Sequence, residues 1–242
     1  MIRLLASVRD AAETDTVLGA GADIIDLKDP AKGALGAVAP DTIRECVTQV
    51  SGRKPVSATV GDLPMAPDAV TQAVAATSSL GVDDVKLGIV PGGDPDGCFA
   101  RLRRLDQRAG LILVFFADAM PPFDPVEAAK AACARGVMLD TARKEAGALV
   151  DHMAMDEIAR FVDEGRRAQL LVGLAGSLRA SHVAALLTLA PDVIGFRGAL
   201  CRHGERSHSL DPVACREIRS LIPAGLGATE MGFQEPQAAA LC

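Results

Sequence analysis

Lysine is scarce in this chain, and several of its lysines fall where chemistry is expected. The sequence has six lysines against nineteen arginines. A lysine that loses its proton in a dry environment becomes an amine able to attack a carbonyl group, whereas arginine stays protonated. Lys28, Lys86 and Lys144 lie at or just beyond the ends of three predicted strands. We therefore expect Schiff-base chemistry on a carbonyl substrate. A GC-rich genome, which favours arginine codons, would explain the same count without any function.

The alternation of side chains along a strand places charges together. Asp26 and Lys28 share one face of a predicted strand, and so do Asp84 and Lys86. The residues between them are apolar, so the charged faces should point into the fold, where charge is costly unless paired or functional. One interpretation is structural pairing between lysine and aspartate. The other is that clustered ammonium groups lower one another's pKa and make one amine nucleophilic.

Apolar runs alternate with amphipathic segments along most of the chain. The predicted strands are 3–8, 24–28, 55–60, 84–88, 110–117, 136–140, 169–175 and 193–197. The predicted helices are 10–19, 40–50, 66–79, 94–108, 124–135, 155–167, 178–189 and 211–221. Eight strand–helix units predict the α/β class and a single (β/α)₈ TIM barrel over residues 1–222, followed by a loosely ordered tail over 223–242. A doubly wound sheet is the alternative, but its Gly-rich first turn is missing between residues 7 and 13.

In such a barrel the active site lies where strands end. The polar residues expected there, besides the lysines, include Asp140 and a substrate-binding set. Gly-rich turns after the last two strands are typical of phosphate sites made from backbone N–H groups. The predicted substrate-binding set is Asp26, Asp118, Gly176, Ser177, Arg197 and Gly198.

Composition excludes several other classes of function. The net charge is −6 without a basic run, which argues against nucleic acid as a partner. No apolar stretch approaches membrane-spanning length, and the N-terminus does not resemble a signal peptide. The cysteines lie far apart, which favours reduced thiols in the cytoplasm. The four histidines have no metal-binding spacing, so no metal site is predicted.

Seven separated blocks, spanning about residues 1–222, resemble the (5-formylfuran-3-yl)methyl phosphate synthase family. The blocks are 22–37 (ADIIDLKDP through GALGA), 57–62 (SATVGD), 86–88 (KLG), 117–118 (AD), 138–144 (MLDTA with Lys144), 174–177 (LAGS) and 195–199 (GFRGA). The resemblance implies a class I aldolase-like barrel, a lyase, that joins two molecules of glyceraldehyde 3-phosphate into a phosphorylated furan aldehyde. It also implies a place in methanofuran-type cofactor biosynthesis.

By position, the resemblance assigns Lys28 as the Schiff-base lysine and Lys86 as a second catalytic lysine. It assigns Asp140 and Lys144 as an acid/base pair. Each step of such a reaction is a proton transfer or an elimination, so we expect no cofactor and no metal. Two phosphates enter, and Arg9 or Arg143 is a guess for the second phosphate site. The expected partner is a small phosphosugar, and self-association into a homo-oligomer is possible.

Two rival functions remain open on the sequence. One is another class I phosphosugar aldolase or isomerase on the same barrel, which would form no furan. The other is a non-enzymatic phosphosugar-binding barrel, in which the lysines only pair with Asp26 and Asp84.

Overall fold

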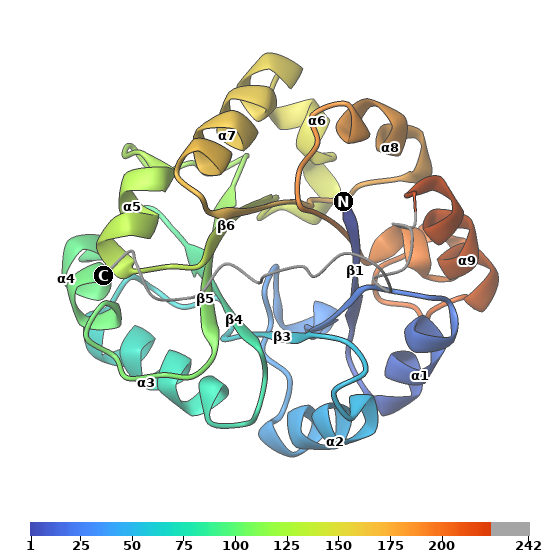
Figure 1. The fold of residues 1–242 in the computed structure, drawn as a ribbon, viewed down its shortest axis with the longest axis horizontal. Coiled ribbons are helices and arrows are strands. Elements are labelled where there is room, and N and C mark those ends of the chain that lie inside the picture. Colours follow the sequence, from blue (N-terminus) through green and yellow to red (C-terminus); the bar gives the residue numbers. More distant parts are fainter. Residues whose placement is uncertain (224–242) are drawn as a thin grey trace, which may run out of the picture.

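The computed structural model describes residues 1–223, and eight parallel strands close into a barrel there (Figure 1). The strands pair in chain order, and the first also pairs with the last, so the sheet has no edge. This confirms the predicted (β/α)₈ barrel. The strands are β1 Arg3–Val8, β2 Ile24–Leu27, β3 Val56–Thr59, β4 Asp84–Ile89, β5 Gly110–Phe116, β6 Gly136–Asp140, β7 Leu171–Leu174 and β8 Val193–Phe196.

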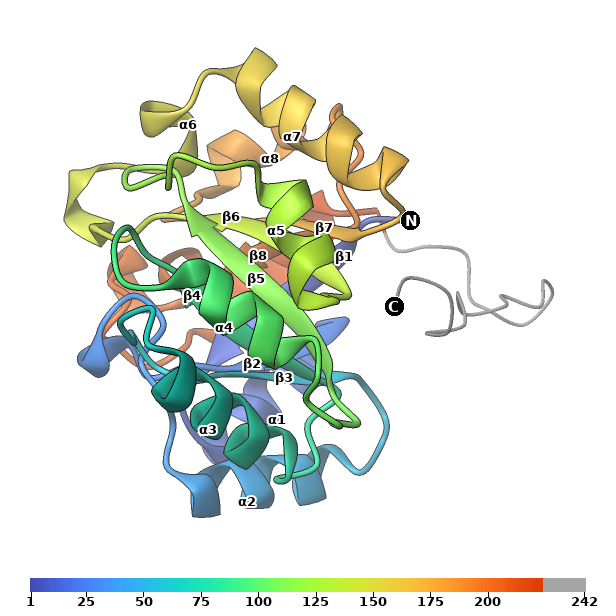
Figure 2. The ribbon, with the colours of Figure 1, turned by 90° about the vertical axis from the view of Figure 1, so that its left-hand side faces the viewer.

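The α-helices form a ring outside the strands (Figures 1 and 2). They are α1 Ala11–Gly19, α2 Pro40–Val50, α3 Pro67–Ser78, α4 Pro95–Leu102, α5 Pro125–Ala132, α6 Leu149–His152, α7 Met155–Arg167, α8 Ala180–Leu187 and α9 Pro212–Leu221. Short 3₁₀ helices are η1 Pro30–Lys32, η2 Lys144–Ala146, η3 Gly198–Leu200 and η4 Arg202–Gly204. The 3₁₀ helices and α6 were not predicted.

Aspartate–proline pairs start three of the helices. Asp94, Asp124 and Asp211 each cap a helix by accepting a hydrogen bond from a backbone N–H of its first turn. The helix predicted to reach residue 108 ends at Leu102. Its last turn tightens, because the N–H groups of Arg104 and Leu105 donate three residues back rather than four.

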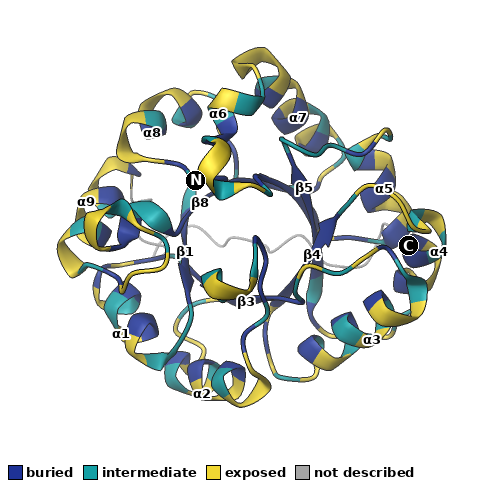
Figure 3. Cartoon of the chain, turned by 180° about the vertical axis from the view of Figure 1, so that it is seen from behind, coloured by how far each residue is buried: buried dark blue, intermediate teal, exposed yellow. Residues whose placement is uncertain are grey.

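The two faces of each strand have different surroundings. Outward side chains such as Ile25 and Leu87 pack under the helices, and burial is greatest at this inner layer (Figure 3). Inside the barrel, Met138 fills the space beside Gly173 and Gly195, where an added Cβ would lie 3.0 Å from its side chain. Glycines on β7 and β8 therefore leave room for the long Met138 side chain inside the barrel.

Residues 224–242 lie outside the described part of the chain, and with them almost all of the predicted tail, 223–242. Among residues 1–223, no helix is long and apolar enough to cross a membrane. Four cysteines (Cys46, Cys98, Cys201 and Cys215) are free thiols, as predicted. Cys133 departs from that prediction, because it is disulfide-bonded.

Candidate active site

The three lysines singled out in the sequence converge inside the mouth of the barrel. Lys28 follows β2, Lys86 lies in β4, and Lys144 begins η2, four residues after Asp140 at the end of β6. The Lys28 Nζ lies 3.5 Å from a carboxylate oxygen of Asp140, and Lys144 contacts the other oxygen of the same carboxylate. The Lys86 Nζ lies 3.1 Å from Asp26. Asp140 therefore pairs with both Lys28 and Lys144, and Asp26 pairs with Lys86.

The surroundings of Lys28 favour its neutral amine. Burial lowers the pKa of Lys28 to about 8; Asp140 opposes this shift, while Lys144 and Lys86 add to it. For Asp140, burial acts to raise the pKa, but Lys144 and Lys28 outweigh it and hold the pKa below its usual range. At neutral pH the cluster thus contains a firmly ionised carboxylate beside an amine that loses its proton readily.

Asp26 lies beneath the lysines, and its side chain is fully buried. Its carboxylate accepts hydrogen bonds from the hydroxyls of Ser7 and Ser57, at 2.8 and 2.7 Å, as well as from Lys86. Burial acts to raise the pKa of Asp26, but Lys86, Lys28 and the two hydroxyls lower it overall. Asp26 therefore positions Lys86, and its side chain is not free for the substrate contact that was expected.

Asp84 does not pair with Lys86 as the strand pattern suggested. It lies at the start of β4, where Arg135 donates to it at 3.0 Å. Although both residues point inward, the two positions differ in height along the barrel, because β4 carries Asp84 at its lower end and Lys86 nearer the mouth. The lysines do form buried ion pairs, as the structural interpretation expected, but only Lys86 uses one of the two expected aspartates, Asp26; Lys28 pairs with Asp140, and Asp84 pairs with Arg135.

A cavity of about 500 Å³ opens above the lysines. Its wall includes the catalytic candidates and the loops after β6, β7 and β8. Lys28, Lys86, Asp140, Lys144, Gly176, Ser177, Arg197 and Gly198 all line it, and so do Arg179 and Arg206. Asp26 and Asp118 are absent from this wall. The cavity is large enough for a small phosphorylated ligand.

The loop after β7 offers backbone donors to this cavity. Gly176 has φ of +104°, and an added Cβ would lie 3.0 Å from the backbone nitrogen of Thr141, so glycine is needed there. Ser177 also has positive φ, and its hydroxyl donates to the carbonyl of Lys144 at 3.1 Å. Among described residues, none accepts a hydrogen bond from the N–H of Gly176 or Ser177. Two backbone N–H groups in the cavity wall therefore have no hydrogen-bond acceptor among the described residues, and their binding of a phosphate stays a prediction.

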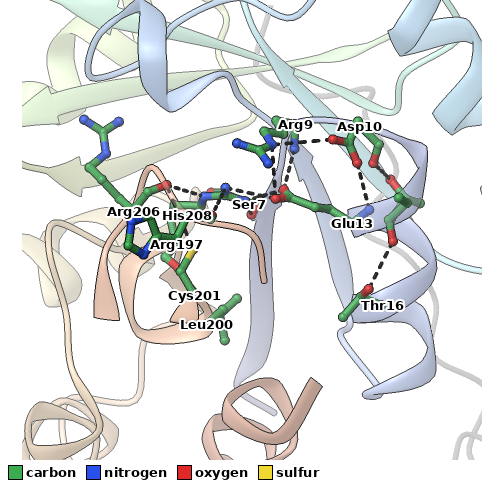
Figure 4. Close-up of polar contacts among 12 residues, drawn as sticks. Ser7, Arg9, Asp10, Glu13, Thr16, Arg197, Leu200, Cys201, Arg206 and His208 are labelled. Atoms are coloured by element: carbon green, nitrogen blue, oxygen red, sulfur yellow. Dashed lines mark hydrogen bonds and ion pairs between the residues drawn. The ribbon is translucent and has the colours of Figure 1, made fainter. Parts of the chain in front are cut away.

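The side chain of Arg197, by contrast, hydrogen-bonds to other groups of the protein (Figure 4). Its guanidinium forms a two-pronged, buried ion pair with Glu13 of α1. Its remaining N–H groups donate to the carbonyls of Ser7, Arg206 and His208, at 3.0–3.2 Å. All five donors are occupied, which leaves the side chain none for the predicted phosphate contact. Gly198, at the start of η3, still lines the cavity with its backbone.

Asp118 and the two guessed arginines also have other contacts. The carboxylate of Asp118 is fully buried and accepts the backbone N–H groups of Ala142 and Arg143, so it shapes the loop after β6. The Arg143 side chain is 71% exposed and rests on Asp118. Arg9 bonds Glu13 and the carbonyl of Ser207. Neither Arg9 nor Arg143 lines the cavity.

Four residues that matter here were not predicted from the sequence: Ser7, Ser57, Glu13 and Arg206. Ser7 and Ser57 were within reach, because the same inward alternation that selected Asp26 places them beside it in register. Glu13 and Arg206 gave no local signal, since each is one acidic or basic residue in a polar segment.

Among described residues, no group of three or more His, Cys, Asp or Glu side chains could hold a metal ion.

Residues 4–219 match the 4-HFC-P synthase family. The chain belongs to this family. A putative (5-formylfuran-3-yl)methyl phosphate synthase of Methylorubrum extorquens is 38% identical over 223 residues, 92% of each chain. The (5-formylfuran-3-yl)methyl phosphate synthase of Methanopyrus kandleri is 35% identical over 217 residues, 85% of this chain and 92% of that one.

Solved structures share the fold at much lower identity. The putative copper homeostasis protein CutC of Streptococcus agalactiae has a TM-score of 0.65 at 12% identity, covering 81% of this chain and 98% of its own. A 3-hexulose-6-phosphate synthase has a TM-score of 0.59 at 18% identity, covering 91% of this chain and 100% of its own. At these identities the likeness concerns the barrel alone.

Proposed function

We propose that this protein is a cytoplasmic lyase that condenses two molecules of glyceraldehyde 3-phosphate into (5-formylfuran-3-yl)methyl phosphate through a Schiff base on Lys28, for methanofuran-type cofactor synthesis. The observation that carries the proposal is the Lys28 amine, buried beside the Asp140–Lys144 pair in a phosphate-sized cavity, with its pKa lowered to about 8. Membership of the 4-HFC-P synthase family supports the product.

The first role belongs to Lys28. Its neutral amine attacks the carbonyl of a triose phosphate, and the resulting carbinolamine loses water to give an imine. Lys86, which also lines the cavity, helps to lower the pKa of Lys28 and can donate the proton that the leaving water needs. Asp26 holds Lys86 in place at 3.1 Å.

Proton transfer in the later steps falls to Asp140 and Lys144. The imine makes the adjacent C–H acidic, so a base can remove that proton and the carbon can join the second triose. Loss of one phosphate and two waters then completes an aromatic ring. Asp140 and Lys144 form a hydrogen-bonded pair within reach of Lys28, which suits one group to accept a proton and the other to donate one.

The loop at Gly176 and Ser177 would bind one phosphate through its free N–H groups. A phosphate bound there lies next to Lys144, since Ser177 bonds the Lys144 carbonyl. The substrate carbonyl would then face the lysine cluster, which is the geometry that imine formation requires.

The direct test uses glyceraldehyde 3-phosphate as sole substrate. We expect near-ultraviolet absorbance from a conjugated furan aldehyde, together with release of inorganic phosphate. Borohydride added during turnover should leave a substrate adduct on Lys28, identified by peptide mass mapping. A non-conjugated six-carbon product with the adduct would indicate a simple aldolase instead. Absence of any adduct, with full activity in Lys28→Arg, would refute the Schiff base.

A further inference from the structure

Arg206 crosses the mouth of the barrel. It belongs to the loop after β8, and its Nη2 donates to the carbonyl of Gly33, in the loop after β2, at 2.9 Å. The side chain is half-buried and lines the cavity. Figure 4 shows its guanidinium directed away from the Glu13–Arg197 pair. Arg206 is therefore a cation of the cavity wall that sequence analysis did not select.

The charges around Arg206 place it near the chemistry. Burial lowers the pKa of its guanidinium, while Asp140 and Glu145 act to raise it. Arginine nevertheless stays protonated under any physiological condition. Apart from Gly33, no described residue accepts a hydrogen bond from its side chain. A fixed positive charge with spare donors thus faces the same space as the lysine cluster.

The backbone of Arg206 is held firmly by residues outside the cavity. Its carbonyl accepts a hydrogen bond from Arg197 Nε at 3.0 Å, and Arg197 is itself fixed by Glu13. The carbonyl of His208, two residues later, accepts another from Arg197. The buried ion pair therefore positions the base of the Arg206 side chain before any ligand arrives.

Two different groups of hydrogen-bond donors line the cavity and contact different loops of the barrel. The Gly176–Ser177 loop adjoins the loop after β6, whereas Arg206 contacts the loop after β2. Backbone N–H groups suit a phosphate whose charge stays constant. A protonated guanidinium suits one whose charge increases as its C–O bond breaks, because it stabilises the developing negative charge.

We propose that Arg206 binds the phosphate group that leaves during the condensation, a role that rests on the proposed function. A base removes the proton from the carbon next to the activated carbonyl. The C–H electron pair forms the new C=C bond, and the C–O pair departs with the phosphate oxygen, which takes up a proton. Arg206 stabilises that departing oxyanion, and the Gly176–Ser177 loop holds the phosphate that remains.

The test compares Arg206→Ala and Arg206→Lys with Arg202→Ala, a matched control in the same loop whose side chain is exposed and does not line the cavity. Furan formation and phosphate release should fall together in Arg206→Ala by about 10²–10³-fold. Arg206→Lys should fall less, and Arg202→Ala should behave as wild type. Borohydride trapping of dihydroxyacetone phosphate on Lys28 should persist in all three, because imine formation precedes elimination.

Binding of inorganic phosphate, measured by calorimetry, gives a readout that does not need turnover. Wild type and Arg202→Ala should bind phosphate at two sites, whereas Arg206→Ala should keep the site at the Gly176–Ser177 loop and bind at the other site at least about tenfold more weakly. Unchanged phosphate binding and unchanged turnover in Arg206→Ala would overturn the inference while leaving the furan synthase intact. If wild type forms no furan, the proposed function fails and the leaving-group role fails with it, whereas weaker phosphate binding in Arg206→Ala would still establish the anion site.

Discussion

Two groups of buried charges lie close together at the mouth of this barrel, and they differ in kind. In the lysine cluster, Lys28 and Lys144 share the carboxylate of Asp140, so positive charge exceeds negative charge. In the Glu13–Arg197 pair, one carboxylate meets one guanidinium, and carbonyls accept every remaining N–H of the arginine. The first group contains an amine, Lys28, whose pKa is lowered to about 8.

The difference follows from the residue types. A buried ammonium is a compact charge that loses its proton when desolvated, whereas a guanidinium keeps its charge and satisfies five hydrogen bonds in a fixed plane. Lysine therefore suits a site where a proton must move, and arginine suits one where the backbone must stay fixed. Substitutions in the lysine cluster and in the Glu13–Arg197 pair test this difference.

The largest effect is expected from Lys28→Arg. Arginine cannot form an imine, so borohydride trapping should vanish and turnover should fall by at least about 10³–10⁴-fold. Lys28→Met removes the same amine with less bulk and should have the same effect on turnover. Lys130→Arg, in an exposed pair on α5, should behave as wild type. A Lys28→Met protein with near-normal turnover would contradict the assignment.

Breaking the other group should affect stability most. Glu13→Gln leaves the Arg197 charge buried without its carboxylate, which should lower the free energy of unfolding by about 3–5 kcal/mol in urea titrations. The matched change Glu127→Gln disrupts an exposed pair with Lys130 and should cost about 0–1 kcal/mol. Equal losses in the two variants would mean that the buried Glu13–Arg197 pair contributes no more to the free energy of unfolding than an exposed pair does.

The pH dependence should separate the two groups further. Trapping at Lys28 should increase as pH rises through about 8, since the neutral amine reacts. Lys144→Gln removes a positive charge that lowers the Lys28 pKa, so the profile should move to higher pH. Lys86→Gln should move it in the same direction by less. A profile that moved to lower pH in either variant would contradict the charge arrangement.

The same shift has a consequence for stability. The Lys28 pKa is lower in the folded protein than its ordinary value of 10.5, so the unfolded chain binds more protons between about pH 8 and 10.5. The contribution of Lys28 to stability should therefore improve across that window as pH rises. Comparing urea titrations of wild type and Lys28→Met at pH 7 and pH 10 measures this directly. The expectation is contradicted if the stability of wild type, relative to that of Lys28→Met, does not rise between pH 7 and pH 10.

The smallest effect is expected from Arg143→Ala. Its side chain is largely exposed and only rests on Asp118, so stability should change by about 0–1 kcal/mol and turnover by less than about twofold. Asp118→Asn is the informative partner, because the carboxylate of Asp118 holds two backbone N–H groups of the loop. A large loss of turnover in Arg143→Ala would instead support Arg143 as a ligand of the second phosphate.

The barrel and the lysine cluster were predictable because both follow from periodic patterns. Alternation within β2 and β4 placed Lys28 and Lys86 on the inner face, and the end of β6 placed Asp140 beside them. The partners of those charges were less predictable. Asp84 bonds Arg135 rather than Lys86, and this depends on the height of each residue along a tilted strand, which sequence spacing does not give.

Arg197 illustrates the limit more clearly. Its position after β8 favoured phosphate binding, yet its partner Glu13 lies 184 residues earlier in the chain. The two meet only because β1 pairs with β8 when the barrel closes. Arg206 has the same property, since its contact with Gly33 spans 173 residues. Contacts made by ring closure leave no local trace in the sequence.

Closure also sets an order of events as the chain is made. The Asp26 contacts with Ser7, Ser57 and Lys86 are complete within the first half of the chain, by residue 86. Lys28 receives its carboxylate only when Asp140 emerges, and the Glu13 carboxylate receives Arg197 later still. During synthesis the residues that hold Lys86 are therefore all made before the carboxylate that pairs with Lys28. The ion pair between α1 and the loop after β8 becomes possible last, and a chain that ends before residue 140 contains Lys28 without the carboxylate that pairs with it.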